Sequence, residues 1–138
     1  MKDLLLQSTF SQKREERLMV ARLPFSVVGA TTESFLVGKL PANAIVEDAY
    51  VFATTASNAA TTDVVTIGTA ENGTEIMSAG DAKTAGKTGT FTGYSYTGTG
   101  KNVYVKHTVT GAKSAGELLV VIRYVEVDKT NGEYTRVS

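Results

Sequence analysis

Cysteine and tryptophan are absent from the sequence, histidine occurs once, and proline occurs twice. Without cysteine there are no disulfides or thiolate metal sites, and a single histidine cannot build a histidine-based metal cluster. The formal net charge is zero, so the basic excess typical of nucleic-acid binders is missing. No apolar run approaches the roughly 20 residues that cross a bilayer. The first residues also lack a secretory signal. We therefore expect a soluble protein, made without export, that has no cofactor and binds neither nucleic acid nor membranes.

Most of the chain has instead the two-residue periodicity of β-strands. The most apolar stretch is 118–127, which begins with five consecutive aliphatic residues and is typical of a strand covered on both faces. Before it, residues 102–110 alternate, with Val103, Val105, His107 and Val109 on one side. Because glycines at 111 and 116 bracket the link between these segments, the pattern predicts an antiparallel hairpin.

Further short strands are predicted between turn signals, at 18–23, 25–28, 33–40, 45–55, 63–69 and 75–77. Asn72-Gly73 favours a type I′ hairpin turn, and Asn131-Gly132 leaves open whether the C-terminus folds back or projects. Residues 78–101 hold little apolar pattern, and we expect a long surface excursion there. About eight strands with turns every 8–12 residues predict an all-β protein, a jelly-roll-like β-sandwich spanning residues 18–138.

The first 17 residues differ from the rest and are interpreted as an N-terminal arm. Thr9 and Gln12 have the spacing of a capping box, which would open a short helix with Leu6 and Phe10 on one face. One reading is a frayed terminus. The other is an arm that docks on a capsid or neighbouring subunit through Leu4, Leu5, Leu6 and Phe10, with Arg14 and Arg17 meeting acidic groups.

No residue pattern specifies an active site, and we expect no enzyme. The segment 80–88 has five residues between its glycines where a phosphate-binding loop needs four. His107 is expected to be a hydrogen-bonded core or interface residue. Glu47 and Asp48 point to opposite faces of a strand. Glu71 and Glu75, beside the turn, are expected to be solvated.

Two tyrosines leave a second kind of function open. Tyr94 and Tyr96 could stack on a sugar, as in a carbohydrate-binding module; the alternative is ordinary strand surface.

The order of features resembles a known group of virion proteins. Residues 40–56 are followed by the strand 63–70, the Glu-Asn-Gly-Thr turn at 71–74, a loop rich in Gly, Ala and Thr, and the final apolar pair 103–106 and 116–125. This order resembles the small jelly-roll proteins of tailed-bacteriophage virions, particularly the head decoration (cement) proteins, over about residues 33–127. The resemblance implies a β-sandwich without catalysis, which forms trimeric or dimeric caps that clamp neighbouring major capsid subunits.

From this resemblance we expect a structural virion protein on the capsid surface, made in the host bacterial cytoplasm, with the major capsid protein as its partner. A tail, adaptor or fibre component is the alternative within the virion. The strands carry more apolar surface than one sandwich needs to cover, so a homo-oligomer is predicted, with a trimer favoured. The residues predicted for its contact face are Tyr50, Phe52, Leu119 and Val121.

Overall fold

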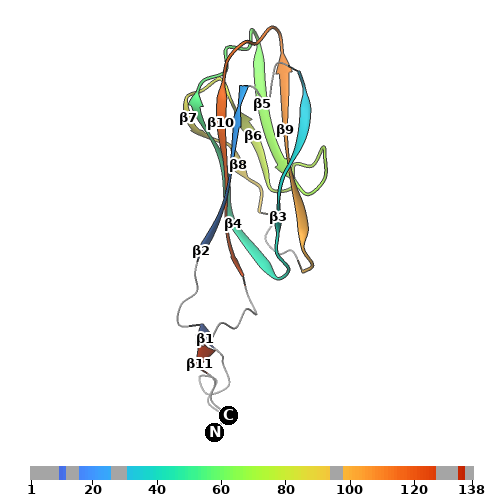
Figure 1. Ribbon diagram of the computed structural model, residues 1–138, viewed down its shortest axis with the longest axis vertical. Coiled ribbons are helices and arrows are strands. Elements are labelled where there is room, and N and C mark those ends of the chain that lie inside the picture. Colours follow the sequence, from blue (N-terminus) through green and yellow to red (C-terminus); the bar gives the residue numbers. More distant parts are fainter. Residues whose placement is uncertain (1–9, 12–15, 26–30, 94–97, 127–133, 136–138) are drawn as a thin grey trace.

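The computed structural model describes residues 10–11, 16–25, 31–93, 98–126 and 134–135. Two antiparallel sheets pack face to face in a sandwich, and a two-stranded ribbon extends from one end (Figure 1). The predicted all-β sandwich is therefore confirmed. Eleven strands lie within the described residues, against the eight or so predicted, and three of them contain only two residues.

The first sheet has the order β2-β10-β4-β7 and the second sheet the order β3-β9-β5-β6-β8. The first sheet consists of β2 (Glu16–Pro24), β4 (Ala44–Thr55), β7 (Gly86–Thr88) and β10 (Glu117–Glu126). The second contains β3 (Glu33–Leu40), β5 (Thr62–Gly68), β6 (Met77–Asp81), β8 (Thr90–Phe91) and β9 (Lys101–Thr110). The ribbon pairs β1 (Phe10–Ser11) with β11 (Tyr134–Thr135).

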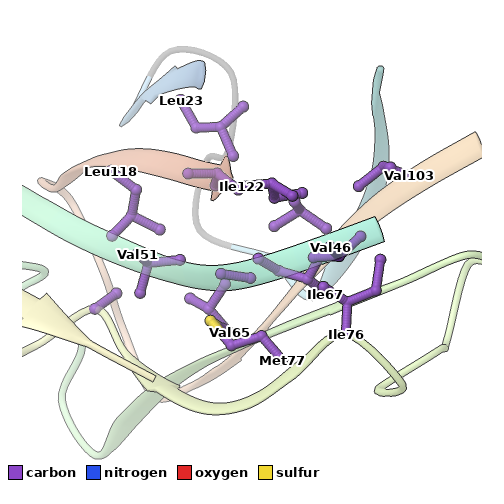
Figure 2. Packing of buried hydrophobic residues seen from close by; sticks show 14 of the residues in the cluster. Leu23, Val46, Val51, Val65, Ile67, Ile76, Met77, Val103, Leu118 and Ile122 are labelled. Carbon is purple, nitrogen blue, oxygen red and sulfur yellow. The ribbon is translucent and has the colours of Figure 1, made fainter. Parts of the chain in front are cut away.

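One apolar core fills the space between the sheets. Val46 and Val51 of β4 lie over Val65 and Ile67 of β5 and Met77 of β6, as Figure 2 shows. Ile67 and Met77 are fully buried. The predicted inward direction of Val65 and Ile67 is confirmed. Each buried aliphatic side chain of this kind contributes about 1.5–3 kcal/mol, so the core holds the two sheets together.

The predicted hairpin between residues 102–110 and 118–127 is wrong. β9 pairs with β3 and β5 in the second sheet, whereas β10 pairs with β2 and β4 in the first. The inner faces of both strands are buried in one core, β9 from the second sheet and β10 from the first. The link 111–116 therefore crosses from one sheet to the other, and Gly111 makes the turn with a φ of 90°.

The predicted surface excursion at 78–101 is also wrong over its first half. Residues 77–91 form β6, β7 and β8, which belong to both sheets. Small residues are required here by close packing. A Cβ on Gly80 would lie 2.9 Å from the Val65 carbonyl oxygen and 2.8 Å from Met77 Cε. The small residues of this segment are typical of loops, but here they form strands that pack closely against their neighbours.

The turn at Asn72-Gly73 does not have type I′ geometry, because neither residue has the positive φ that this turn needs. The Gly73 N–H donates to the Ala70 carbonyl oxygen at 2.9 Å. A Cβ on Gly68 would lie 2.4 Å from the Gly73 carbonyl carbon, so the chain folds back closely over the end of β5. The returning strand begins at Met77, two residues later than predicted.

The helix predicted to open at Thr9 is wrong at Phe10–Ser11, which form β1 in the terminal ribbon. The remainder of that helix lies outside the described residues. β2 begins at Glu16, so Arg17 is part of the first sheet, where it is the register partner of Tyr124.

Candidate interaction surface

The outward side of the first sheet carries three aligned rows of side chains, and we call it the outer face. The middle row joins Val20, Val121 and Tyr50 across β2, β10 and β4. The rows on either side are Leu18, Arg123 and Asp48, and Arg22, Leu119, Phe52 and Lys87. Register thus brings six large apolar or aromatic side chains onto one surface.

Several of these apolar side chains are largely exposed to solvent. The exposed fractions are 61% for Leu18, 55% for Val20 and 41% for Phe52. Lys87 covers part of Tyr50, with Nζ 4.4 Å from the ring centroid, an arrangement that is attractive electrostatically. The outer face is therefore an apolar surface with aromatic residues toward β4, and such patches mark interaction sites in soluble proteins.

Charged pairs border this apolar surface. At one end Arg22 Nε lies 2.5 Å from Glu117 Oε1, and Thr54 Oγ1 donates to Glu117 Oε2 at 3.1 Å. The hydrogen bond from Arg22 is the main cause that lowers the pKa of the Glu117 carboxyl. At the other end Arg123 Nε lies 4.0 Å from Glu47 Oε1. An apolar centre with a charged border is the usual anatomy of a protein–protein contact.

The outward side of the second sheet differs in composition. Ser34, Lys106 and Thr66 form one row, and Thr108 lies opposite Val64. Leu36 is 58% exposed. Apolar residues on this side are thus interspersed with hydroxyl and charged side chains.

The four residues predicted for an oligomer face, Tyr50, Phe52, Leu119 and Val121, are neighbours on the outer face. That this face contacts another subunit stays a prediction. Of the predicted arm contacts, Leu4, Leu5, Leu6 and Arg14 lie outside the described residues. Phe10 is in β1. Arg17 is in β2, with Nε 3.9 Å from Glu126 Oε2.

A second group of polar residues lies inside the sandwich, and we call it the interior cluster. It consists of Asp63 on β5, His107 on β9 and Lys113 in the link from β9 to β10. Lys113 Nζ lies 2.6 Å from Asp63 Oδ2, and His107 Nδ1 lies 3.7 Å from Asp63 Oδ1. All three side chains are at most 1% exposed. The predicted core position of His107 is confirmed, although 3.7 Å is too long for a hydrogen bond.

The environment of Asp63 keeps its carboxyl ionised. Burial by itself would raise the pKa of Asp63, but the neighbouring His107, Lys113 and Ser57 side chains outweigh burial and lower it. Lys113 contributes both a hydrogen bond and its charge. Two buried charges at this distance form a tightly coupled pair, and removal of either leaves the other without compensation.

The remaining motifs have structural roles. In the segment that resembled a phosphate loop, Asp81 accepts hydrogen bonds from the Lys83 N–H at 2.9 Å and from the Thr84 hydroxyl at 2.8 Å.

Glu75 is not fully solvated as predicted, because its carboxylate accepts hydrogen bonds from the N–H and hydroxyl of Thr69. Burial alone would raise the pKa of Glu75, but these bonds outweigh burial and lower it.

Tyr94 and Tyr96, the residues predicted for sugar stacking, lie outside the described residues. Within the described part of the chain, no group of His, Asp or Glu side chains is arranged to hold a metal ion. No helix in that part is long and apolar enough to span a membrane.

Sequence reasoning missed the interior cluster apart from His107. A signal for Asp63 was present, since it has the same strand parity as the inward Val65 and Ile67. Lys113 stands in a link without periodicity, so no pattern indicated that its side chain would be buried.

No protein-family model matches the chain, and no curated protein does. Two solved structures contain chains of similar fold. One is the cyanophage Pam1 capsid asymmetric unit, with 21% identity and a TM-score of 0.66 over 85% of this chain and 89% of that chain. The other is the acidic stable capsid structure of Helicobacter pylori bacteriophage KHP30, with 16% identity and a TM-score of 0.61 over 82% of this chain and 90% of that one. At this level of identity the comparisons establish a shared β-sandwich fold.

Proposed function

We propose that this protein is a structural component of a bacteriophage virion that binds the outer surface of the capsid and stabilises it. The observation that carries the proposal is the fold shared with chains of two phage capsid structures. The outer face supplies a surface suited to protein contact. The interior cluster is closed to substrates, because its side chains are at most 1% exposed.

The extent of the likeness supports a small separate component. The alignments cover between 82% and 90% of each chain involved, so the matched chains are close to this one in length. The likeness is therefore to a whole chain within each capsid structure and not to one domain of a much longer chain.

The physical mechanism is added buried surface across junctions of the shell. A homotrimer, assembled in the host cytoplasm, would engage several major capsid protein subunits at once. Linked contacts of this kind raise the apparent affinity far above that of one contact. Exposed apolar residues such as Leu18 and Val20 would be covered either between copies or against the shell.

The test is reconstitution with capsids that lack this protein. Purified protein is mixed with such capsids at several salt concentrations, and co-sedimentation is measured together with the temperature at which the capsids open. We expect saturable binding and a higher opening temperature. Absence of binding at every salt concentration would overturn the proposal. Electron microscopy of labelled particles locates the protein on the virion. A position on the tail would favour an adaptor or fibre component over a capsid-binding protein.

The terminal segment is tested in the same assay. Because β2 begins at Glu16, deletion of residues 1–15 removes β1 and leaves the sandwich strands complete. We expect an unchanged unfolding transition of the sandwich and at least a tenfold loss of capsid affinity, about 1.4 kcal/mol. Binding equal to that of the full chain would remove the docking role of the arm.

A further inference from the structure

Lys113 and Asp63 form a buried pair in which the amino nitrogen lies beside the carboxyl group. The ammonium nitrogen is 2.6 Å from Oδ2, and both side chains are at most 1% exposed. A nitrogen at this distance from a carboxylate oxygen is within reach of the carbon to which that oxygen is bonded, and reacting atoms in near-attack conformers are about 3–3.5 Å apart.

The pair is ionised at rest, and it lies among aromatic rings where burial raises the energy of both charges. The Phe25 ring centroid is 6.0 Å from Lys113 Nζ, and the Phe35 ring stacks on His107 with centroids 5.8 Å apart. An apolar environment penalises charged groups strongly. Transfer of a proton from the ammonium to the carboxylate, which yields an amine and an acid, is therefore far less costly here than in water.

His107 is placed to move protons beside the carboxyl group. Its Nδ1 lies 3.7 Å from Asp63 Oδ1, and among the described residues Nε2 has no hydrogen-bond partner. The ring is thus not committed to another acceptor, and imidazole is the side chain best suited to give and take protons near neutral pH.

We propose that Lys113 and Asp63 condense into an intramolecular isopeptide bond. The proton moves from Nζ to the carboxylate, and the resulting amine attacks Cγ. The Nζ–Cγ bond forms, one Cγ–O bond breaks, and the oxygen leaves as water with two protons from nitrogen, one of them relayed by His107. The charges of the pair cancel, so the reaction balances with water as its only other product and needs no oxidant or co-reactant.

Proximity lowers the barrier of a condensation that is very slow between free amines and acids in water. Well-oriented intramolecular groups reach effective concentrations of about 10⁵–10⁸ M, and the interior holds little water to reverse the step. The bond would tie β5 to the link that crosses between the two sheets. This inference is independent of the proposed function, since it concerns the folded chain alone.

The experiment is a tryptic peptide map of the full chain, purified in the folded state and denatured before digestion. Trypsin does not cleave after an acylated lysine. We therefore expect one branched species that joins peptide 40–83 to peptide 107–123 and lacks the mass of one water molecule. The proposal would be overturned if residues 107–123 were recovered only as the free peptides 107–113 and 114–123, with no branched species, after prolonged incubation of the folded protein.

The matched control is Lys113→Arg, which keeps the positive charge, cannot form the bond and restores cleavage at residue 113. Lys113→Met is the second control, used if Lys113→Arg does not fold because the larger side chain cannot be accommodated. In His107→Gln we expect the branched species to form at least tenfold more slowly. Formation at the wild-type rate would overturn the role of His107. A branched peptide that uses a different lysine would overturn the assignment to Lys113.

Discussion

Two cation–carboxylate pairs of nearly equal length lie in opposite surroundings in this protein. In the interior cluster, Lys113 Nζ is 2.6 Å from Asp63 Oδ2, and the side chains are 1% and 0% exposed. On the outer face, Arg22 Nε is 2.5 Å from Glu117 Oε1, and the side chains are 68% and 21% exposed. The distances alone would rank the two pairs as equals.

Their surroundings separate them by several kcal/mol. An exposed pair gains little, because water screens the attraction and solvates either ion alone, and such pairs contribute about 0–1 kcal/mol. A buried ion without its partner has no such alternative. The interior cluster is therefore expected to control folding stability, whereas the outer face remains available for association.

The largest expected effect comes from Lys113→Met. This change leaves the Asp63 carboxyl buried without a cation, and we expect a loss of about 3–5 kcal/mol in the free energy of unfolding. The reference is Lys113→Arg, which keeps the positive charge and cannot form the proposed bond, and denaturant unfolding of the two variants at neutral pH measures the difference. A loss below 1 kcal/mol would place the interior cluster in the same class as the exposed pair and break the comparison.

The second prediction concerns pH and uses Lys113→Arg, in which residue 63 keeps a free carboxyl. Burial alone would raise the folded-state pKa of Asp63, but His107, the cation at residue 113 and Ser57 together lower it below the unfolded value. The pair therefore contributes stability that is fully present above the ordinary carboxyl pKa of about 3.9 and is lost as pH falls through the folded-state pKa.

Unfolding measured from pH 7 to pH 3 tests this dependence. Wild-type protein in which the isopeptide bond has formed has no carboxyl at residue 63 to titrate, so its stability should fall less over this range. Parallel curves for the two proteins would contradict the expectation.

The sequence predicted those parts of the fold whose signal is local. Val65 and Ile67 alternate with polar neighbours, and Pro41 follows the strand at 33–40, so these strands were found nearly at their observed bounds. The alternation within residues 45–55 likewise placed Tyr50 and Phe52 on the side opposite to Val51 and Ala53, as the structure has them.

The remainder depended on contacts between distant residues. The alternation of residues 102–110 is the same whether the next strand lies beside β9 or across the core from it, so the hairpin could not be distinguished from the crossing. Gly80 is typical of a loop, and only its close contact with Val65 explains why glycine stands in this strand. The burial of Lys113 depends on its pairing with Asp63, which lies 50 positions earlier in the chain.

The third prediction compares the two outward sides of the sandwich with matched substitutions. Leu18 and Leu36 are 61% and 58% exposed, and each lies on an edge strand of its sheet. Leu18→Ser combined with Val20→Ser is expected to reduce capsid affinity at least tenfold, about 1.4 kcal/mol. Leu36→Ser combined with Val64→Ser is expected to leave it unchanged. Co-sedimentation measures both pairs, and equal losses would mean that the outer face has no special role.

The smallest effect is expected for Arg22→Met on the exposed pair. Thr54 continues to donate to Glu117 when Arg22 is removed, and water screens the exposed pair, so the free energy of unfolding should hardly change. Added salt should reduce even this difference, because screening acts on exposed charges first. Since Arg22 borders the outer face, its loss is more readily detected as a slower association rate with capsids at low salt. A loss of stability as large as that of Lys113→Met, insensitive to salt, would mean that a neighbouring subunit shields Arg22 and Glu117 in solution, and the pair would then belong to a buried interface.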